Sequence, residues 1–164
     1  MKFKDFINEL FNTAYKVKEE TTDRPGHYRY YFKTDEGQEY RVTIISNSVL
    51  YYKSKSLVRY EILFQNLSVG QDMAGRAKSM EILGTGDSFK VFSTVLAVTK
   101  DFIQKHEKDK DFGGFYFECQ NKPSRLKLYK AFAEKAKKAF PKYYYRESAD
   151  SANTRFIFDK YEER

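Results

Sequence analysis

Two stretches with a period of two, on either side of a turn signal, constrain the fold of this chain most strongly. Residues 27–33 alternate aromatic and polar side chains, and residues 39–45 alternate apolar and polar ones. This period puts successive side chains on opposite faces, as in a strand with one buried face. The link between them, residues 34–38, contains Gly37, and short links of this kind join antiparallel strands. The sequence therefore predicts a β-hairpin.

A third strand is predicted after an irregular stretch. Residues 46–56 are rich in Ser and Tyr without a clear period, and we expect a loop or a ragged sheet edge there. Residues 57–67 return to a period of two, which indicates a strand. We expect Val58, Tyr60, Ile62 and Phe64 to lie on one face of this strand.

The second half of the chain predicts helices and strands in alternation. We expect a helix over 88–107, a strand over 115–119, a helix over 124–139, and strands over 143–147 and 154–159. Asp87 or Ser88 is the expected cap of the first helix, and Ser124 follows a proline as the expected cap of the second. The fold class expected from this order is α+β, a mostly antiparallel sheet with two long helices packed on it.

The chain is expected to contain an N-terminal part and one domain. Residues 1–26 are interpreted as an amphipathic helix followed by a linker, since the polar run 18–26 ends in a Pro-Gly turn signal. Residues 27–164 are interpreted as a single α+β domain, long enough for a core. The single cysteine, Cys119, excludes an internal disulfide and a Cys-based zinc site, and we expect no metal. Its apolar neighbours favour a buried thiol over a nucleophile.

The N-terminal stretch carries an apolar stripe at helical spacing, formed by Phe3, Phe6, Ile7, Leu10 and Phe11. It resembles the capsid-targeting peptide of internal head proteins in large tailed phages. Those peptides begin with Met-Lys and are cut by the prohead protease after a Glu. The protease pattern occurs once here, at Ile7-Asn8-Glu9. The resemblance implies that targeting and cleavage depend on Phe3, Phe6, Ile7 and Glu9. The alternative is a helix that packs on the protein's own core.

This resemblance also implies partners and a location. The partners would be prohead scaffold or core proteins, DNA through weak non-specific contact, and an unknown host protein, but no membrane. The location would be the virion interior and then the host cytoplasm, because internal head proteins often act against host defences. Nothing in the chain approaches the roughly 20 consecutive apolar residues that span a membrane.

A basic segment indicates contact with a polyanion. The chain has a net charge of +7, and residues 120–146 hold nine basic residues against one acid, Glu134. Such a field attracts phosphates without reading sequence. The candidate polyanion-binding residues are Lys122, Arg125, Lys127, Lys130, Lys135, Lys137, Lys138 and Lys142. Three tyrosines at 143–145 follow them and could stack on bases, although a strand must turn at least one inward. The alternative is an ordinary solvated helix face.

A glycine turn ahead of the first long helix resembles the cofactor turn of the GNAT acyltransferases. In that family such a turn opens a helix and holds the pyrophosphate of acetyl-CoA, and a tyrosine on the last helix often protonates the leaving thiolate. The resemblance implies an acetyl-CoA site at Gly84, Thr85 and Gly86, with Tyr129 as the catalytic acid. Glu81 stands where the family has Gln or Arg, and a carboxylate there repels a pyrophosphate.

These observations support three interpretations. The first is a phage-encoded basic protein that is packaged in the prohead, contacts DNA and requires no cofactor. The second is a GNAT-fold, acetyl-CoA-dependent N-acyltransferase. The third is a non-catalytic structural or interaction domain.

Overall fold

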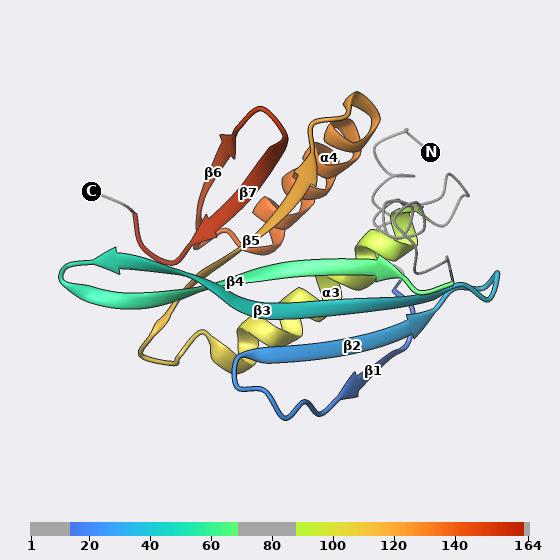
Figure 1. Cartoon of the computed structure of the whole chain (residues 1–164), viewed down its shortest axis with the longest axis horizontal. Helices are drawn as coiled ribbons and strands as arrows, with labels where there is room; N and C mark the ends of the chain where they lie inside the picture. The colour runs from blue at the N-terminus through green and yellow to red at the C-terminus, as the bar shows by residue number, and fades with distance from the viewer. Residues whose placement is uncertain (1–13, 69–87, 163–164) are drawn as a thin grey trace. The chain divides into compact units, whose positions relative to one another are not determined.

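The computed structural model describes residues 14–68 and 88–162. This part of the chain is α+β, with a mostly antiparallel sheet of seven strands and two helices (Figure 1). The strands are β1 (Val17–Glu20), β2 (His27–Lys33), β3 (Glu39–Tyr52), β4 (Lys55–Asn66), β5 (Phe112–Gln120), β6 (Tyr144–Ala149) and β7 (Asn153–Asp159). The helices are α3 (Ser88–His106) and α4 (Pro123–Ala139). The predicted fold class is confirmed at this level.

The strand order in the sheet is β1-β2-β3-β4-β5-β7-β6. Strands β4 and β5 are parallel, and their register runs from Val58 opposite Phe112 to Glu61 opposite Tyr116. The chain divides into two compact units: residues 1–43 and 64–101 form the first, and residues 44–63 and 102–164 form the second. Strands β3 and β4 and helix α3 therefore each contribute residues to both units.

The first unit has a core of stacked aromatic rings. Tyr15 stacks on Phe32 with ring centroids 5.7 Å apart, and Phe32 stacks on Tyr40 at 5.3 Å. Phe64 of β4 meets Phe92 of α3 edge to face at 5.5 Å. Because burying these rings removes large apolar surfaces from water, they supply much of the stability of this unit.

The prediction of a linker before residue 27 is partly wrong. Val17–Glu20 form strand β1, which pairs antiparallel with β2 from Val17 opposite Phe32 to Glu20 opposite Arg29. A polar composition misled the prediction, because an edge strand can leave most of its side chains in water. Tyr15 is buried beside this strand, so the packed domain includes residues before the expected start at His27. The predicted amphipathic helix itself lies outside the described residues.

The second unit buries an aromatic face of β5 and β7 against α4 (Figure 1). Phe115 stacks on Phe158 at 4.8 Å, and Phe117 stacks on Phe156 at 5.3 Å. Phe132 of α4 contacts Phe117 edge to face at 4.8 Å. These pairs follow the antiparallel register of β5 with β7, which places Phe115 opposite Phe158 and Phe117 opposite Phe156.

The loop expected over residues 46–56 is instead the end of the long β3–β4 hairpin. Strand β3 continues to Tyr52 and β4 begins at Lys55, so the turn consists of Lys53 and Ser54. Both residues have positive φ, 47° and 65°. Two-residue turns of this kind favour Gly, Asn or Asp at these positions, and their absence removed the usual sequence signal. Val58 was expected on the same face as Tyr60, but the register shifts between Val58 and Arg59, and Leu57 is buried together with Tyr60 instead.

Helix α4 starts one residue before the predicted cap. Its N-cap is Lys122, with proline in the first turn and no side-chain capping hydrogen bond, so the prediction of Ser124 as cap is wrong. Proline at the first helical position needs no hydrogen-bond partner for its nitrogen, which favours this start. The other predicted caps, Asp87 and Ser88, lie outside the described side chains.

An ion pair in the second unit crosses over a glycine. Arg59 Nε and Nη2 donate to the two carboxylate oxygens of Asp159, each at 2.8 Å. The side chains are 12% and 3% exposed. The register places Gly114 of β5 between the two residues, opposite Arg59 on one side and Asp159 on the other. Because glycine has no side chain, the pair can lie directly over the backbone of β5.

Candidate polyanion-binding surface

One side of α4 carries a row of exposed lysines. The row consists of Lys127, Lys130, Lys137 and Lys138, all exposed. The opposite side carries the buried residues Tyr129, Phe132, Ala133 and Ala136. With a rise of 1.5 Å per residue, the row extends about 16 Å along the helix. We call these four lysines the α4 lysine row.

The other predicted basic residues lie around this row. Lys122 and Lys142 are exposed beyond the two ends of α4. Arg125 is half-buried, and its Nη1 donates to Gln120 Oε1 at 2.6 Å. Lys135 is half-buried, and its partial burial, together with the positive charge of Lys138, lowers the pKa of its ammonium group. A bound anion would offset this repulsion between neighbouring cations.

Within α4 itself, little negative charge offsets the α4 lysine row. Glu134 is the one acid in α4, and its carboxylate lies 3.2 Å from Lys137 Nζ. Their side chains are 65% and 41% exposed. Exposed pairs of this kind contribute only about 0–1 kcal/mol. Lys137 Nζ also lies 4.9 Å from the centroid of the Tyr145 ring, which places this end of the row beside β6.

The tyrosines that follow the basic helix do not form an exposed stack beside it. Tyr143 packs against Phe115 at 5.7 Å, and Tyr145 packs against Phe158 at 5.0 Å. Tyr144 is 50% exposed and alternates to the other face of the sheet. Tyr143 and Tyr145 therefore turn inward and contact core rings, although both are only half-buried and neither is a fully buried core residue. The aromatic residues at 143–145 do not extend the α4 lysine row.

The structure places Tyr129 in the core. Its side chain is 5% exposed, and its ring lies 6.2 Å from the rings of both Phe117 and Phe156. Burial raises the pKa of its hydroxyl well above the ordinary value. The rest of the predicted cofactor site, Gly84, Thr85 and Gly86, lies outside the described residues. The targeting residues Phe3, Phe6, Ile7 and Glu9 lie outside them as well.

Cys119 is a buried thiol, as its apolar neighbours predicted. Burial, the largest cause, raises its pKa to about 11, so it stays protonated near neutral pH. Residues 14–68 and 88–162 contain no group of three or more His, Cys, Asp and Glu side chains that could hold a metal ion.

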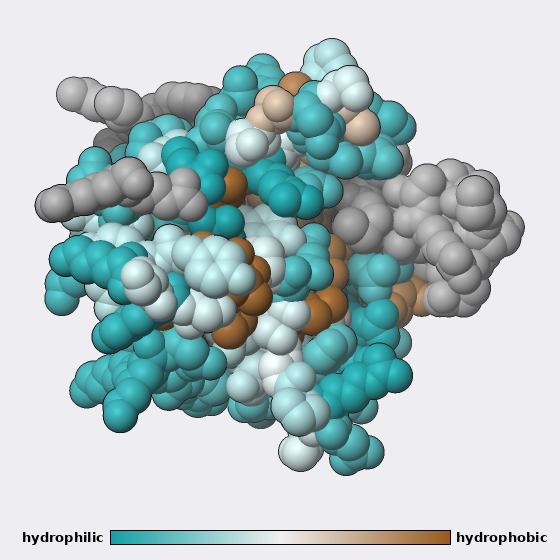
Figure 2. Space-filling model, turned by 60° about the vertical axis from the view of Figure 1, so that its left-hand side comes forward, coloured by the Kyte–Doolittle hydropathy of each residue, from teal (hydrophilic) through white to brown (hydrophobic). Residues whose placement is uncertain are grey.

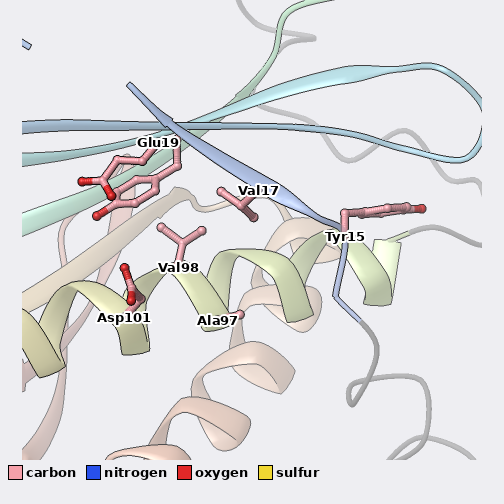
Figure 3. A pocket seen from close by; sticks show the side chains of 7 residues that line it. Tyr15, Val17, Glu19, Ala97, Val98 and Asp101 are labelled. Carbon is pink, nitrogen blue, oxygen red and sulfur yellow. The ribbon is translucent and has the colours of Figure 1, made fainter. Parts of the chain in front are cut away.

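A groove in the first unit has the opposite electrostatic character. It has a volume of about 330 Å³ and lies between β1 and α3 (Figure 3). Val17 and Val98 face each other across it, while the carboxylates of Glu19 and Asp101 lie at the end away from Tyr15. Two carboxylates repel phosphates, so this groove does not belong to a polyanion-binding surface. The sequence did not predict the groove, because β1 was interpreted as linker.

Comparison with protein-family models, curated proteins and solved structures finds no match for this chain. Within the described ranges, no helix is long and apolar enough to cross a membrane. The α4 lysine row offers ammonium groups at one surface, and such groups bind phosphate oxygens as point charges.

Proposed function

We propose that this protein is a basic, non-catalytic protein that contacts nucleic acid through the phosphates facing α4. The observation that carries the proposal is the α4 lysine row, four exposed cations on one side of a helix that contains a single acid. Ammonium groups attract phosphates of any sequence, so the expected binding is non-specific. The helix is anchored by its aromatic inner face and presents this row on a fixed support.

Salt dependence gives the sharpest test of this proposal. A protein that neutralises four phosphates of duplex DNA should show a slope of about −3.6 in a plot of log K against log salt concentration. We would measure binding to a fluorescein-labelled mixed-sequence duplex by anisotropy between 50 and about 200 mM salt, the range over which such contacts weaken most.

The test variant replaces Lys127, Lys130, Lys137 and Lys138 with Gln. The matched control replaces four exposed lysines elsewhere, Lys18, Lys33, Lys100 and Lys108, so both proteins lose the same charge. We expect the first variant to lose most of its affinity and its salt slope, and the control to keep its slope. Equal weakening of both variants would mean that only net charge matters and would refute a site on α4.

We further propose that the protein is packaged in a phage prohead through its first residues and trimmed after Glu9. The support is the resemblance of the N-terminal stretch and its one Ile-x-Glu pattern. Removing residues 1–9 takes away two bases and two acids, so the trimmed protein keeps its net charge of +7. It would meet DNA in the virion interior and a host protein in the cytoplasm. Mass spectrometry of purified virions should find a chain that begins at Leu10; an intact N-terminus or absence of the protein would contradict packaging.

A GNAT-type acyltransferase is the second candidate function. The observation that favours it is the order of elements. The parallel strands β4 and β5 are connected through α3, and Gly84 and Gly86 precede α3 in the sequence. The buried hydroxyl of Tyr129 does not favour it. Calorimetric titration with acetyl-CoA at about 200 mM salt separates the candidates. Phosphate contact with the α4 lysine row alone should be lost in the Gln variant of that row, whereas saturable binding that this variant retains supports the acyltransferase. Absence of both acetyl-CoA and DNA binding would leave a structural or interaction domain.

A further inference from the structure

The end of the β3–β4 hairpin carries an exposed aromatic ring on one face and two exposed lysines at its turn. Tyr51 is 78% exposed, the highest value among the large apolar side chains of the described ranges, and Val49 on the same face is 54% exposed. The turn residue Lys53 and the first residue of β4, Lys55, are also exposed. In Figure 2, which brings forward the side where the hairpin ends in Figure 1, apolar and weakly polar side chains gather among hydrophilic ones.

The other face of the hairpin end is fixed by a stacked tyrosine pair. Tyr52 stacks on Tyr161 with centroids 4.6 Å apart and an interplanar angle of 12°. Lys53 Nζ lies 5.3 Å from the Tyr52 centroid, and Lys160 Nζ lies 5.6 Å from that of Tyr161. Lys160 is itself held, since its Nζ donates to the Glu107 carbonyl and its backbone N–H donates to the Gly113 carbonyl. These contacts support the strand that presents Tyr51, which lowers the entropy lost when a ligand stacks on it.

We infer that the hairpin end, defined by Val49, Tyr51, Lys53 and Lys55, binds single-stranded nucleic acid, with an unpaired base stacked on Tyr51 and the phosphates of the flanking nucleotides passing round the turn to the two lysines. Every base has a face that can stack on an aromatic ring, and lysine holds the backbone beside it. The inference rests on the proposed function and deepens it, because it names unpaired strands as the preferred polyanion. In a duplex the bases are already stacked, so Tyr51 adds nothing there.

The choice of occupant follows from charge and composition. A protein partner that covered an apolar patch would bury the ammonium groups of Lys53 and Lys55, which carries a large desolvation cost unless acids meet them. A nucleic acid supplies a ring and anions in one repeating unit, and its phosphates can stay partly hydrated. Glu162 lies one residue beyond Tyr161 and is exposed, so its charge opposes the phosphates. Glu162→Gln should therefore strengthen binding.

Three labelled ligands of equal length test the inference on the full chain: oligo(dT), a duplex, and an abasic deoxyribose-phosphate strand. Tyr51→Ala should weaken oligo(dT) binding roughly 5- to 150-fold, the effect of losing one base–aromatic stack. It should leave duplex and abasic-strand binding within about twofold, because neither offers an unpaired base. Tyr51→Phe should retain oligo(dT) binding. Tyr144→Ala is the matched control, since Tyr144 is also an exposed tyrosine at 50% but lies on β6.

The outcomes separate this inference from the proposed function. If the wild-type protein binds the duplex and the Gln variant of the α4 lysine row does not, the proposed function stands. Unchanged oligo(dT) binding by Tyr51→Ala would then overturn the inference alone. Equal losses in Tyr51→Ala and Tyr144→Ala would also overturn it. A wild-type protein that binds none of the three ligands overturns both. Thermal unfolding of each variant checks folding, and the exposed position of Tyr51 predicts an unchanged midpoint.

Discussion

Replacing Gly114 with alanine should destabilise the protein far more than adding a methyl group at an ordinary position does. A Cβ at this position would lie 2.3 Å from the Phe158 carbonyl oxygen and 3.1 Å from Asp159 Oδ1. Strands β5 and β7 would have to separate by about 0.7 Å to bring the shortest contact to 3.0 Å. Overpacking of this kind costs about 1–3 kcal/mol. Gly114 also has φ +148°, a conformation in which a side chain adds strain of about 1–3 kcal/mol.

We therefore expect Gly114→Ala to lower the free energy of unfolding by about 2–6 kcal/mol, the sum of the two costs. Gly37→Ala is the matched control. Gly37 has φ +84°, but the nearest atom to a Cβ there is Lys33 Cε at an ordinary 3.8 Å, so only backbone strain of about 1–2 kcal/mol remains.

Urea unfolding followed by far-UV circular dichroism gives both values on the same scale. If Gly114→Ala lowers the free energy of unfolding no more than Gly37→Ala does, β5 and β7 do not approach closely enough at Gly114 to exclude a methyl group. A large cost should also appear as faster amide exchange in β7, since the carbonyl that moves belongs to Phe158.

Three further results are expected. Asp159→Asn should cost about 3–5 kcal/mol in the same urea experiment, because it leaves the largely buried Arg59 cation without its carboxylate; a cost below 1 kcal/mol would contradict this. Cys119 should resist a thiol reagent in the folded protein, since burial raises its pKa to about 11, and should react once urea unfolds the chain; rapid reaction without urea would be inconsistent with burial. Asp150 should titrate below an ordinary aspartate in a carbon-13 NMR experiment, because the N–H groups of Asn153 and Ala152 donate to its Oδ1. Its stabilising effect should be complete above the ordinary aspartate pKa and disappear as pH falls through the lowered value, and an unshifted titration would count against the turn.

The periodicity of apolar residues predicted α4 and β5 well, because the burial of one face requires apolar side chains at regular spacing. The stripe over 124–139 matches α4, where Tyr129, Phe132, Ala133 and Ala136 are buried. The run 115–119 lies within β5, although β5 begins earlier, at Phe112. Both elements press apolar side chains into a core, which leaves a clear pattern in the sequence.

The parts that sequence missed are those whose structure depends on neighbouring strands. Strand β1 is mostly exposed and is held by backbone hydrogen bonds to β2, which leave no apolar pattern. The hairpin turn at Lys53 and Ser54 lacks the residues that usually signal it. Without that turn signal, residues 46–56 were interpreted as a loop or ragged edge, so the exposed position of Tyr51 on a strand was not predicted. The lysines of α4 were predictable, and the burial of Tyr129, Phe132, Ala133 and Ala136 identifies the side of the helix that they share.

The interleaving of the two units has a consequence for synthesis on the ribosome. Every segment of the first unit lies before residue 102, whereas the hairpin half that belongs to the second unit, residues 44–63, is made long before its partner β5. Until β5 emerges, the edge of β4 that carries Val58 to Glu61 has no strand to pair with. Nascent chains that stop before Phe112 should therefore be the ones that chaperones capture or that aggregate.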